Sequence, residues 1–236
     1  MLQAPQVERL QALICEINYD ELWSNTPFGV VVEALCDVRE ELPNLKALFI
    51  GDREQHEYRK SKLDLFYLRP ILKAYPNLQV LQICDRFCNY KLECESLRHQ
   101  HLKTLIGETA DLDNQNIAQI CAHELPALEY LELWLGRQLS VQPTIDTLLP
   151  ILFGESFPKL SYLGLCSSEC SDLIAEALVQ SPILERLTEL DLSMGNLSDS
   201  GAEALLNPAI NKLHTLNIAN NCVSEGMIQK LLQLNC

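Results

Sequence analysis

Three cysteines and two histidines lie within a short stretch and could bind a metal ion. They are Cys84, Cys88, Cys94, His99 and His101. Thiolates and imidazoles are ligands that zinc prefers, but structural zinc sites pair them as C-x2-4-C with a second matching pair. Only Cys84 and Cys88 fit this spacing, and they fit it loosely. We therefore predict no metal site and keep, as an alternative, a metal- or thiol-dependent enzyme or sensor that uses the Cys84 region.

Motifs of the common catalytic and cofactor sites do not occur in the sequence. It contains no G-x-S-x-G, no G-x-x-x-x-G-K-[ST], no H-E-x-x-H and no G-x-G-x-x-G. His123 and Glu124 form the start of H-E-x-x-H, but the second histidine is missing. The sequence thus predicts a protein that is not an enzyme and that needs no cofactor.

The charge of the chain limits its partners. The 236 residues have a formal net charge of −14, and most of the excess negative charge lies in residues 101–236. Such a field repels nucleic acids and anionic lipid surfaces and favours basic partners. The N-terminus lacks the features of a signal peptide, and no apolar run reaches about 18 residues. We expect a cytoplasmic protein with reduced cysteines that binds neither nucleic acid nor membrane.

A leucine pattern repeats seven times and determines the predicted fold. It reads L-x-x-L-x-L or a close variant, and it begins at Leu45, Leu78, Leu102, Leu128, Leu160, Leu187 and Leu213. The last two apolar residues of each unit are two apart, so both point to one face of a short strand. Intervals of 24 to 33 residues between these starts lie within or just above the range of leucine-rich repeats.

Helical spacing follows most of these strands. In "LTELDLSMGNLSDSGAEALL", Ala202, Leu205 and Leu206 recur at three and four residues, after Ser198 and Asp199, which offer N-cap oxygens. Similar segments are "SDLIAEALVQ", "PTIDTLLPILF", "NQNIAQICAH" and "LDLFYLRPILKAY", and Pro70 should bend or delay the last of these. The segment "CDRFCNYKLECESLRHQ" is the weakest helix candidate. Stacked strand–helix units predict an α/β solenoid with a curved parallel sheet on its concave side and helices on its convex side.

Two segments resemble the leucine-rich repeats of ribonuclease-inhibitor-like proteins. They are "LTELDLSMGNLSDSGAEALL" and "LHTLNIANNCVSEGMIQKLL", and Asn221 matches the asparagine ladder of that family. The resemblance covers about residues 45–231. The combination of "LPALEYLELWLG", "PKLSYLGL" and "LDLSMGNLSDSGAEALL" also resembles an uncharacterised bacterial subfamily of such proteins. The resemblance therefore implies a fold and a class of partner, proteins, but no chemistry. Gly195 replaces a ladder asparagine, with Asn196 beside it, and Gly107 replaces a core leucine. We expect less regular geometry at these positions.

The whole chain, residues 1–236, is predicted to be one domain. Residues 1–44 form an N-terminal cap, with a helix in "FGVVVEALCDVREEL" and a strand in "LICEINY", and residues 45–236 form seven repeats. The C-terminal segment "MIQKLLQLNC" has no obvious polar cap. It would therefore allow a homodimer, or a structural or regulatory subunit that associates through this end.

The outward strand positions give the candidate binding site. Acidic and aromatic residues gather on neighbouring strands, at Glu108, Tyr130, Glu132, Trp134, Tyr162, Glu189 and Asp191. Aromatic rings provide apolar anchors, and carboxylates select arginine or lysine. The sequence therefore predicts a protein-interaction module that binds a basic protein or peptide on its concave face.

A hydrolase built on Glu132 and Asp191 is disfavoured by the predicted strand spacing. The two residues lie on non-adjacent strands, which should put about 10 Å between them. This exceeds the usual separation of paired carboxylates in glycosidases.

Overall fold

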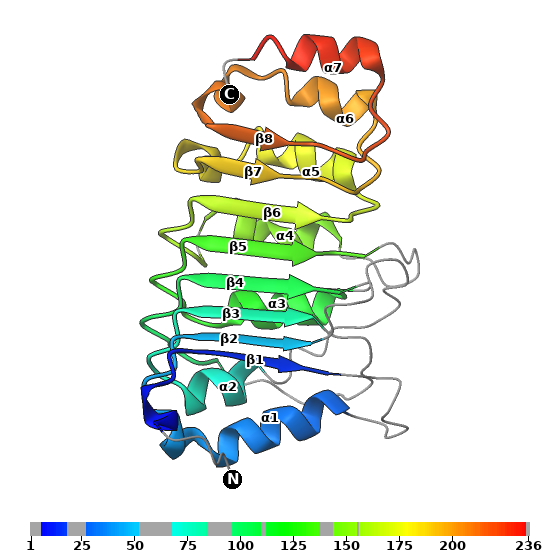
Figure 1. Ribbon diagram of the computed structural model, residues 1–236. Helices are drawn as coiled ribbons and strands as arrows, with labels where there is room; N and C mark the ends of the chain where they lie inside the picture. Colours follow the sequence, from blue (N-terminus) through cyan, green and yellow to red (C-terminus); the bar gives the residue numbers. More distant parts are fainter. Residues whose placement is uncertain are drawn as a thin grey trace.

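A computed structural model describes residues 6–17, 27–51, 68–84, 96–109, 112–136, 144–154 and 156–234. All eight strands in this part of the chain are parallel and form one sheet in sequence order (Figure 1). The strands are β1 (Ala12–Glu16), β2 (Ala47–Gly51), β3 (Val80–Cys84), β4 (Thr104–Glu108), β5 (Tyr130–Trp134), β6 (Tyr162–Cys166), β7 (Glu189–Asp191) and β8 (Thr215–Asn217).

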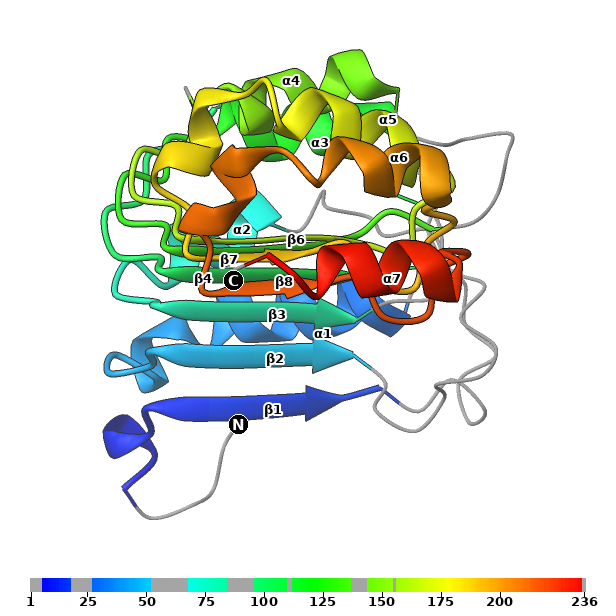
Figure 2. The ribbon, with the colours of Figure 1, turned by 90° about the horizontal axis from the view of Figure 1, so that it is seen from above.

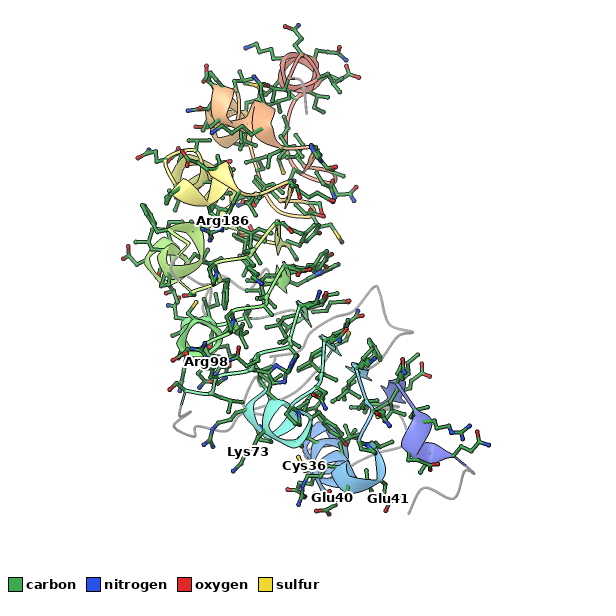
Figure 3. The ribbon with its side chains drawn as sticks, turned by 90° about the vertical axis from the view of Figure 1, so that its left-hand side faces the viewer. Cys36, Glu40, Glu41, Lys73, Arg98 and Arg186 are labelled. Atoms are coloured by element: carbon green, nitrogen blue, oxygen red, sulfur yellow. The ribbon has the colours of Figure 1, made fainter. Side chains whose placement is uncertain are left out.

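A layer of helices covers one face of this sheet. The α-helices are α1 (Pro27–Asp37), α2 (Leu68–Ala74), α3 (Asn114–Ala122), α4 (Ile145–Leu152), α5 (Ser171–Leu178), α6 (Asp199–Ala204) and α7 (Glu225–Leu231). Short 3-10 helices are η1 (Val7–Arg9), η2 (Arg39–Glu41), η4 (Pro182–Glu185) and η5 (Pro208–Lys212). Viewed from above and from the side, the helices follow the outer arc and the strands the inner arc (Figures 2 and 3). None of the helices in the described residues has the length and apolar character needed to cross a bilayer.

The repeated leucines form the core between the sheet and the helices. Leu131 is in register with Leu163, and Leu163 with Leu190, on adjacent parallel strands. All three side chains are at most 1% exposed. The predicted α/β leucine-rich-repeat solenoid is thereby confirmed, since the same leucine position of successive repeats forms one buried row.

The segment before the first predicted repeat adds a strand to the sheet. β1 begins one residue before the segment "LICEINY" that suggested a strand and covers its first four residues, and it pairs in parallel with β2. α1 and η2 account for most of the expected helix "FGVVVEALCDVREEL". The weak helix candidate of residues 84–100 lies largely outside the described residues, and so does the start of the segment that contains Pro70, which is itself within α2.

Gly107 leaves the sheet regular, contrary to expectation. It is in register with Ile83 on β3 and with Leu133 on β5, and its backbone is buried. The glycine therefore removes one side chain from the buried row, but the strand pairing is unchanged.

Asparagines hold the turns that follow the last strands. The Asn221 side chain accepts a hydrogen bond from the Leu197 backbone N–H (2.9 Å) and donates to the Leu192 carbonyl (2.9 Å), so it joins two repeats. One repeat earlier, Asn196 donates to the Glu169 carbonyl (2.6 Å). A Cβ at Gly195 would lie 2.3 Å from Ser171 Oγ. The ladder asparagine is displaced by one residue because no side chain fits at position 195.

Candidate functional site

Strand alternation places the candidate residues on the face opposite the helices. In β5, Leu131 and Leu133 are fully buried in the core, whereas Tyr130, Glu132 and Trp134 are partly exposed on the other face. The parallel register puts Tyr162 of β6 beside Tyr130, and continues to Glu189 of β7. The predicted concave surface is therefore assembled from neighbouring strands, as the pattern requires.

Glu132 accepts hydrogen bonds from two residues of its own strand. Tyr130 Oη donates to Glu132 Oε2 (2.6 Å), and Trp134 Nε1 donates to Glu132 Oε1 (2.8 Å). Because positions 130, 132 and 134 lie on one face of a strand, the two flanking rings hold the carboxylate between them. The carboxylate is therefore oriented mainly by the rings of its own strand.

Tyr162 connects this carboxylate with a second one. Its hydroxyl lies 3.4 Å from Glu132 Oε2 and 3.4 Å from Asp191 Oδ2. Its ring stacks on Tyr130 with centroids 3.8 Å apart and an angle of 9° between the ring planes. We call Tyr130, Glu132, Trp134, Tyr162 and Asp191 the acidic-aromatic cluster.

Gly164 provides the space that lets this cluster close. It lies on β6 in register between Glu132 and Asp191. A Cβ at this position would be 3.0 Å from Glu132 Cγ and 3.2 Å from Tyr162 Cε1. Contacts this short are tighter than ordinary packing, so the missing side chain is what allows the tyrosine ring and the carboxylate to converge over the strand.

The expected separation of about 10 Å between Glu132 and Asp191 is wrong for their carboxylate oxygens. Both oxygens lie 3.4 Å from one hydroxyl, so they are less than about 7 Å apart, a limit that admits the separations of paired carboxylates in glycosidases. Strand spacing sets the distance between backbones, but the side chains lean together over Gly164. The spacing therefore does not exclude hydrolysis, although the Tyr162 hydroxyl occupies the space between the two carboxylates.

The tyrosine hydroxyls of the cluster have pKa values above the ordinary tyrosine pKa, so they stay protonated to a higher pH. Burial raises the pKa of Tyr130, and the hydrogen bond to Glu132 raises it further. Burial likewise raises the pKa of Tyr162, with contributions from its bond to Tyr130 and from the nearby Glu132 charge. Each tyrosine is thus a lasting donor to the carboxylates. Burial, with Asp191 and Glu132 nearby, also raises the pKa of the Cys166 thiol, which opposes a reactive thiolate there.

No cation of the described residues neutralises the cluster. Ion pairs in this part of the chain include Arg98 with Glu124 and Lys103 with Glu129, and neither Glu132 nor Asp191 takes part in one. Their partners are neutral donors instead. Within the part of the chain that the structure describes, the carboxylates are therefore hydrogen-bonded to neutral groups and have no paired cation.

Two predicted site residues lie outside the cluster. Glu108 of β4 accepts a hydrogen bond from Gln82 Nε2 (2.6 Å) on β3, and Glu189 is exposed beside Tyr162. Conversely, Asn217 was not predicted for the site, yet its Nδ2 donates to Asp191 Oδ2 (2.8 Å). The repeat alignment could have predicted this neighbour, because Asn217 occupies the same outward position on β8 as Asp191 on β7.

The alternative metal site has little support in the described residues. Cys88 and Cys94 lie outside them. The buried His99 already uses both ring nitrogens, since Nε2 bonds the Tyr75 carbonyl (3.1 Å) and Nδ1 accepts from the Leu102 N–H (3.1 Å). The described part of the chain holds no group of three metal-ligating side chains. A metal at Cys84 would have to replace these bonds of His99 or find other ligands.

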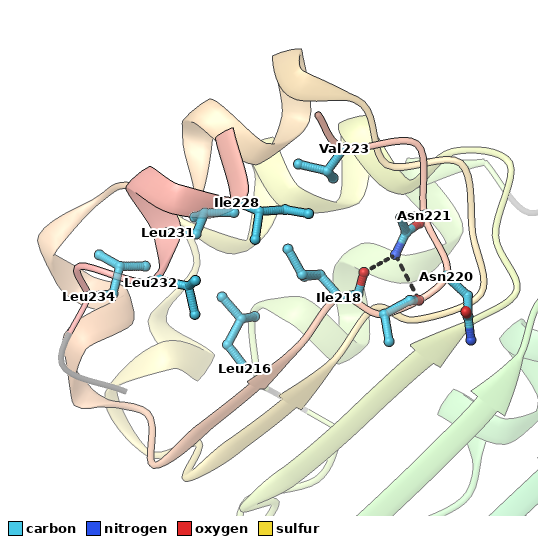
Figure 4. A pocket seen from close by; sticks show the side chains of 10 residues that line it. Leu216, Ile218, Asn220, Asn221, Val223, Ile228, Leu231, Leu232 and Leu234 are labelled. Atoms are coloured by element: carbon cyan, nitrogen blue, oxygen red, sulfur yellow. Dashed lines mark hydrogen bonds between the residues drawn. The ribbon is translucent and has the colours of Figure 1, made fainter. Parts of the chain in front are cut away.

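A second surface feature lies at the C-terminal end of the solenoid. A hollow of ≈ 360 Å³ opens between β8 and α7 (Figure 4). Most of its lining is apolar, and it includes Leu216, Ile218, Val223, Ile228, Leu231, Leu232 and Leu234. Leu232 is 70% exposed and Ile228 is 38% exposed. Apolar side chains thus remain in contact with water at this end of the described residues.

Comparison with solved structures supports the fold. A protein of Bacteroides fragilis superposes with a TM-score of 0.82 at 24% sequence identity, and the match covers 98% of this chain and 65% of that chain. The present chain thus spans about two thirds of the length of that protein. No protein-family model and no curated protein sequence matches the chain.

Two further structures align at much lower similarity. The mouse RP105/MD-1 complex has a TM-score of 0.34 at 19% identity, covering 84% of this chain and 39% of that chain. The TLR13–ssRNA13 complex has a TM-score of 0.25 at 16% identity, covering 83% and 36%. At these TM-scores the two carry no argument about this chain.

Proposed function

We propose that the protein is a non-enzymatic interaction module that binds a basic segment of another protein at the acidic-aromatic cluster. The observation that carries this proposal is the convergence of Glu132 and Asp191 on one tyrosine hydroxyl, with no cation of the described residues paired to either. Concave surfaces of solenoids are extended binding faces. A lysine or arginine of the partner would supply the missing positive charge.

The carboxylates retain the capacity to accept such a cation. An ionised carboxylate has about four acceptor positions. Asp191 uses them for Asn217, for the Ser193 N–H and, at the longer 3.4 Å, for Tyr162. The single hydroxyl proton of Tyr162 can serve only one carboxylate well. A guanidinium that entered beside it would therefore gain charge-assisted bonds at the cost of one long neutral bond.

The position of Tyr162 supports the proposal of binding rather than catalysis. In a glycosidase, the scissile bond and, for inversion, a water molecule lie between the two carboxylates. Here the Tyr162 hydroxyl stands within 3.4 Å of both. A side chain of the protein itself thus bridges the two carboxylates. This arrangement favours recognition of a positive charge at the exposed edge of the pair.

The charge of the chain supports the choice of partner. At a net charge of −14, the molecule repels phosphate backbones and anionic membranes. We therefore propose neither nucleic acid nor lipid as a ligand. The seven cysteines of the described residues are free thiols, which fits the cytoplasm as its location. The working unit is proposed to be residues 1–236 as one domain, with residues 1–44 as its cap.

Selection from a random peptide display library tests the binding proposal. We expect enriched peptides to contain arginine or lysine and to bind less tightly as salt increases. Asp191→Asn should weaken their binding about 10- to 100-fold, since a hydrogen bond to a charged group contributes about 1.5–3 kcal/mol. Fluorescence anisotropy with labelled peptides measures this change.

A matched variant controls for the loss of charge alone. Glu176→Gln removes one exposed carboxylate from α5 on the helical side, and it should change the affinity less than about twofold. Selected peptides without basic residues, or equal weakening by both variants, would show that the cluster is not the binding site.

We also propose self-association through the C-terminal hollow as a second role. The exposure of Leu232 beside a mostly apolar hollow supports it. A second copy of the chain would cover both surfaces at once, in a symmetric dimer.

A further inference from the structure

The concave face changes character between β4 and β5. On β5 to β7 its outward positions carry the acidic-aromatic cluster and Glu189. On β1 to β4 the first two outward positions of each strand are mostly apolar, with Ala12, Ile14, Ala47, Phe49, Val80, Thr104 and Ile106, and with Gln82 as the amide among them, whereas the third outward positions include Glu16 and Glu108. Along the first two rows of positions the face is therefore divided into an apolar half and an acidic half.

The apolar half is partly exposed, and Gln82 interrupts one of its two rows between Phe49 and Ile106. Ile14 on β1 is in register with Phe49 on β2, and Ala47 on β2 is in register with Val80 on β3. Ile14 is 52% exposed and Val80 is 36% exposed. Phe49, between them, is only 9% exposed. Apolar surface shared by neighbouring strands is typical of interaction sites, whereas single exposed aliphatic residues are not informative.

The two halves meet directly. Ile106 on β4 is in register with Glu132 on β5, so the last apolar position is one strand spacing from the first carboxylate of the cluster. A ligand that binds the cluster would extend over the apolar half if it continued towards β1. The face is thus one surface with two chemistries rather than two separate sites.

From this arrangement we propose that the ligand is a bipartite protein segment, apolar at one end and basic at the other, bound across the strands in one orientation. Its basic end lies at Glu132 and Asp191, and its apolar end lies over Ile14 and Val80. This inference rests on the proposed function, because it takes the cluster as the basic subsite.

The width of the face sets the length of the segment. From β1 to β6, which lies between the two carboxylates, there are about five strand spacings, or roughly 24 Å. A helix covers this distance with about 16 residues. The segment must therefore carry its apolar and basic groups well apart in sequence.

Three synthetic peptides test the proposal on the intact chain. The first has 16 residues with leucines in one half and arginines in the other, the second mixes the same residues evenly, and the third is the arginine half alone. We expect the bipartite peptide to bind about tenfold more tightly than the mixed peptide in fluorescence anisotropy. The peptides have equal charge in the first two cases, so net charge alone cannot produce the difference.

Variants on the two halves separate their contributions. Ile14→Ser should weaken binding of the bipartite peptide several-fold and leave the arginine-half peptide unchanged, whereas Asp191→Asn should weaken both. Val80→Ser provides a second apolar variant in case the change in the edge strand disturbs folding. Leu173→Ser is the control, because Leu173 is also 52% exposed but lies on α5.

Each result decides between the two proposals. If the arginine-half peptide binds and depends on Asp191, but the bipartite and mixed peptides bind equally, the bipartite ligand is overturned and the proposed function stands. If none of the three peptides binds, both fail. If sedimentation shows self-association that Ile14→Ser abolishes, a second copy occupies the apolar half and the bipartite segment is again overturned.

Discussion

His99 shows how one buried polar side chain can form hydrogen bonds to backbone groups of two neighbouring segments of the solenoid. Its Nδ1 accepts the backbone N–H of Leu102, and its Nε2 lies 3.1 Å from the Tyr75 carbonyl, so the neutral ring with the proton on Nε2 satisfies both. His123, 24 residues later, accepts the Leu97 N–H in the same way (3.1 Å). Desolvation lowers the pKa of both imidazoles.

The lowered pKa values predict a loss of stability in mild acid. Between pH 6.5 and the lower pKa of the folded state, the unfolded chain binds protons that the folded chain does not, so the free energy of unfolding falls as pH falls. The slope is at most about 1.4 kcal/mol per pH unit for each histidine. Urea denaturation between pH 5.5 and 7.5 should show this decline in the wild type and a shallower one in His99→Gln.

The exposed His214 provides the control for this prediction. His214→Gln should keep the slope of the wild type. An unchanged slope in His99→Gln would mean that its buried ring does not set the pH dependence.

At the scale of elements, the start of each helix in the last repeats is hydrogen-bonded to the start of the following helix. Asp172 at the start of α5 accepts from Ser198 N (2.8 Å) and Oγ (2.6 Å), and Asp199 at the start of α6 accepts from Ser224 N and Oγ (both 2.7 Å). The bonds from Ser224 lower the pKa of Asp199. Each serine also caps its own helix, as the Ser198 pattern predicted.

Because the two helix starts lie so close together, an alanine in place of Gly201 would clash with Asp172. A Cβ there would lie 2.6 Å from Asp172 Cα and 2.3 Å from Asp172 Oδ1. Gly201→Ala should therefore lower the free energy of unfolding by about 1–3 kcal/mol, the usual cost of overpacking. Urea denaturation measures the change.

Gly226, in the first turn of α7, is the matched comparison. Its nearest neighbour to an added Cβ is Ser224 Oγ, at 3.9 Å. Gly226→Ala should stabilise the protein by about 0.5–1 kcal/mol, because alanine favours the helix and no atom must move. Equal effects of the two substitutions would contradict the packing explanation.

At the scale of the whole molecule, surface chemistry is distributed along the arc. The first two outward positions of the concave strands are mostly apolar over β1 to β4 and acidic or aromatic over much of β5 to β7, and the hollow of Leu232 lies at the end beyond β8. A ligand on the concave face and a second copy at the C-terminal end would occupy separate surfaces. Binding and self-association should therefore be separable by mutation.

Leu232→Glu tests the association at the C-terminal end. If two copies pair through this hollow, sedimentation equilibrium should show a concentration-dependent dimer in the wild type, which Leu232→Glu abolishes because a buried unpaired charge is costly. Leu173→Glu, an equivalent change on α5, should leave the dimer intact. A wild type that remains monomeric at all concentrations would remove the proposed self-association.

The sequence by itself predicted the fold because the leucine period is a direct consequence of stacking. Residues such as Leu131 and Leu163 recur at one position, and burial in a common row is the arrangement that removes all of them from water. The helix α5 (Ser171–Leu178) and the N-cap at Ser198 follow from equally local rules. Strand alternation also placed Tyr130, Glu132 and Trp134 on one face.

Tertiary structure decided how those side chains meet. The distance between Glu132 and Asp191 depends on how two side chains lean over Gly164, and the choice of Asn217 as a partner of Asp191 depends on rotamers in a neighbouring repeat. Likewise, a Cβ at position 195 would clash with Ser171 Oγ, 24 residues away, so a glycine stands there. A repeat pattern specifies which positions share a face, whereas the contacts between them depend on packing across strands, which no local spacing encodes.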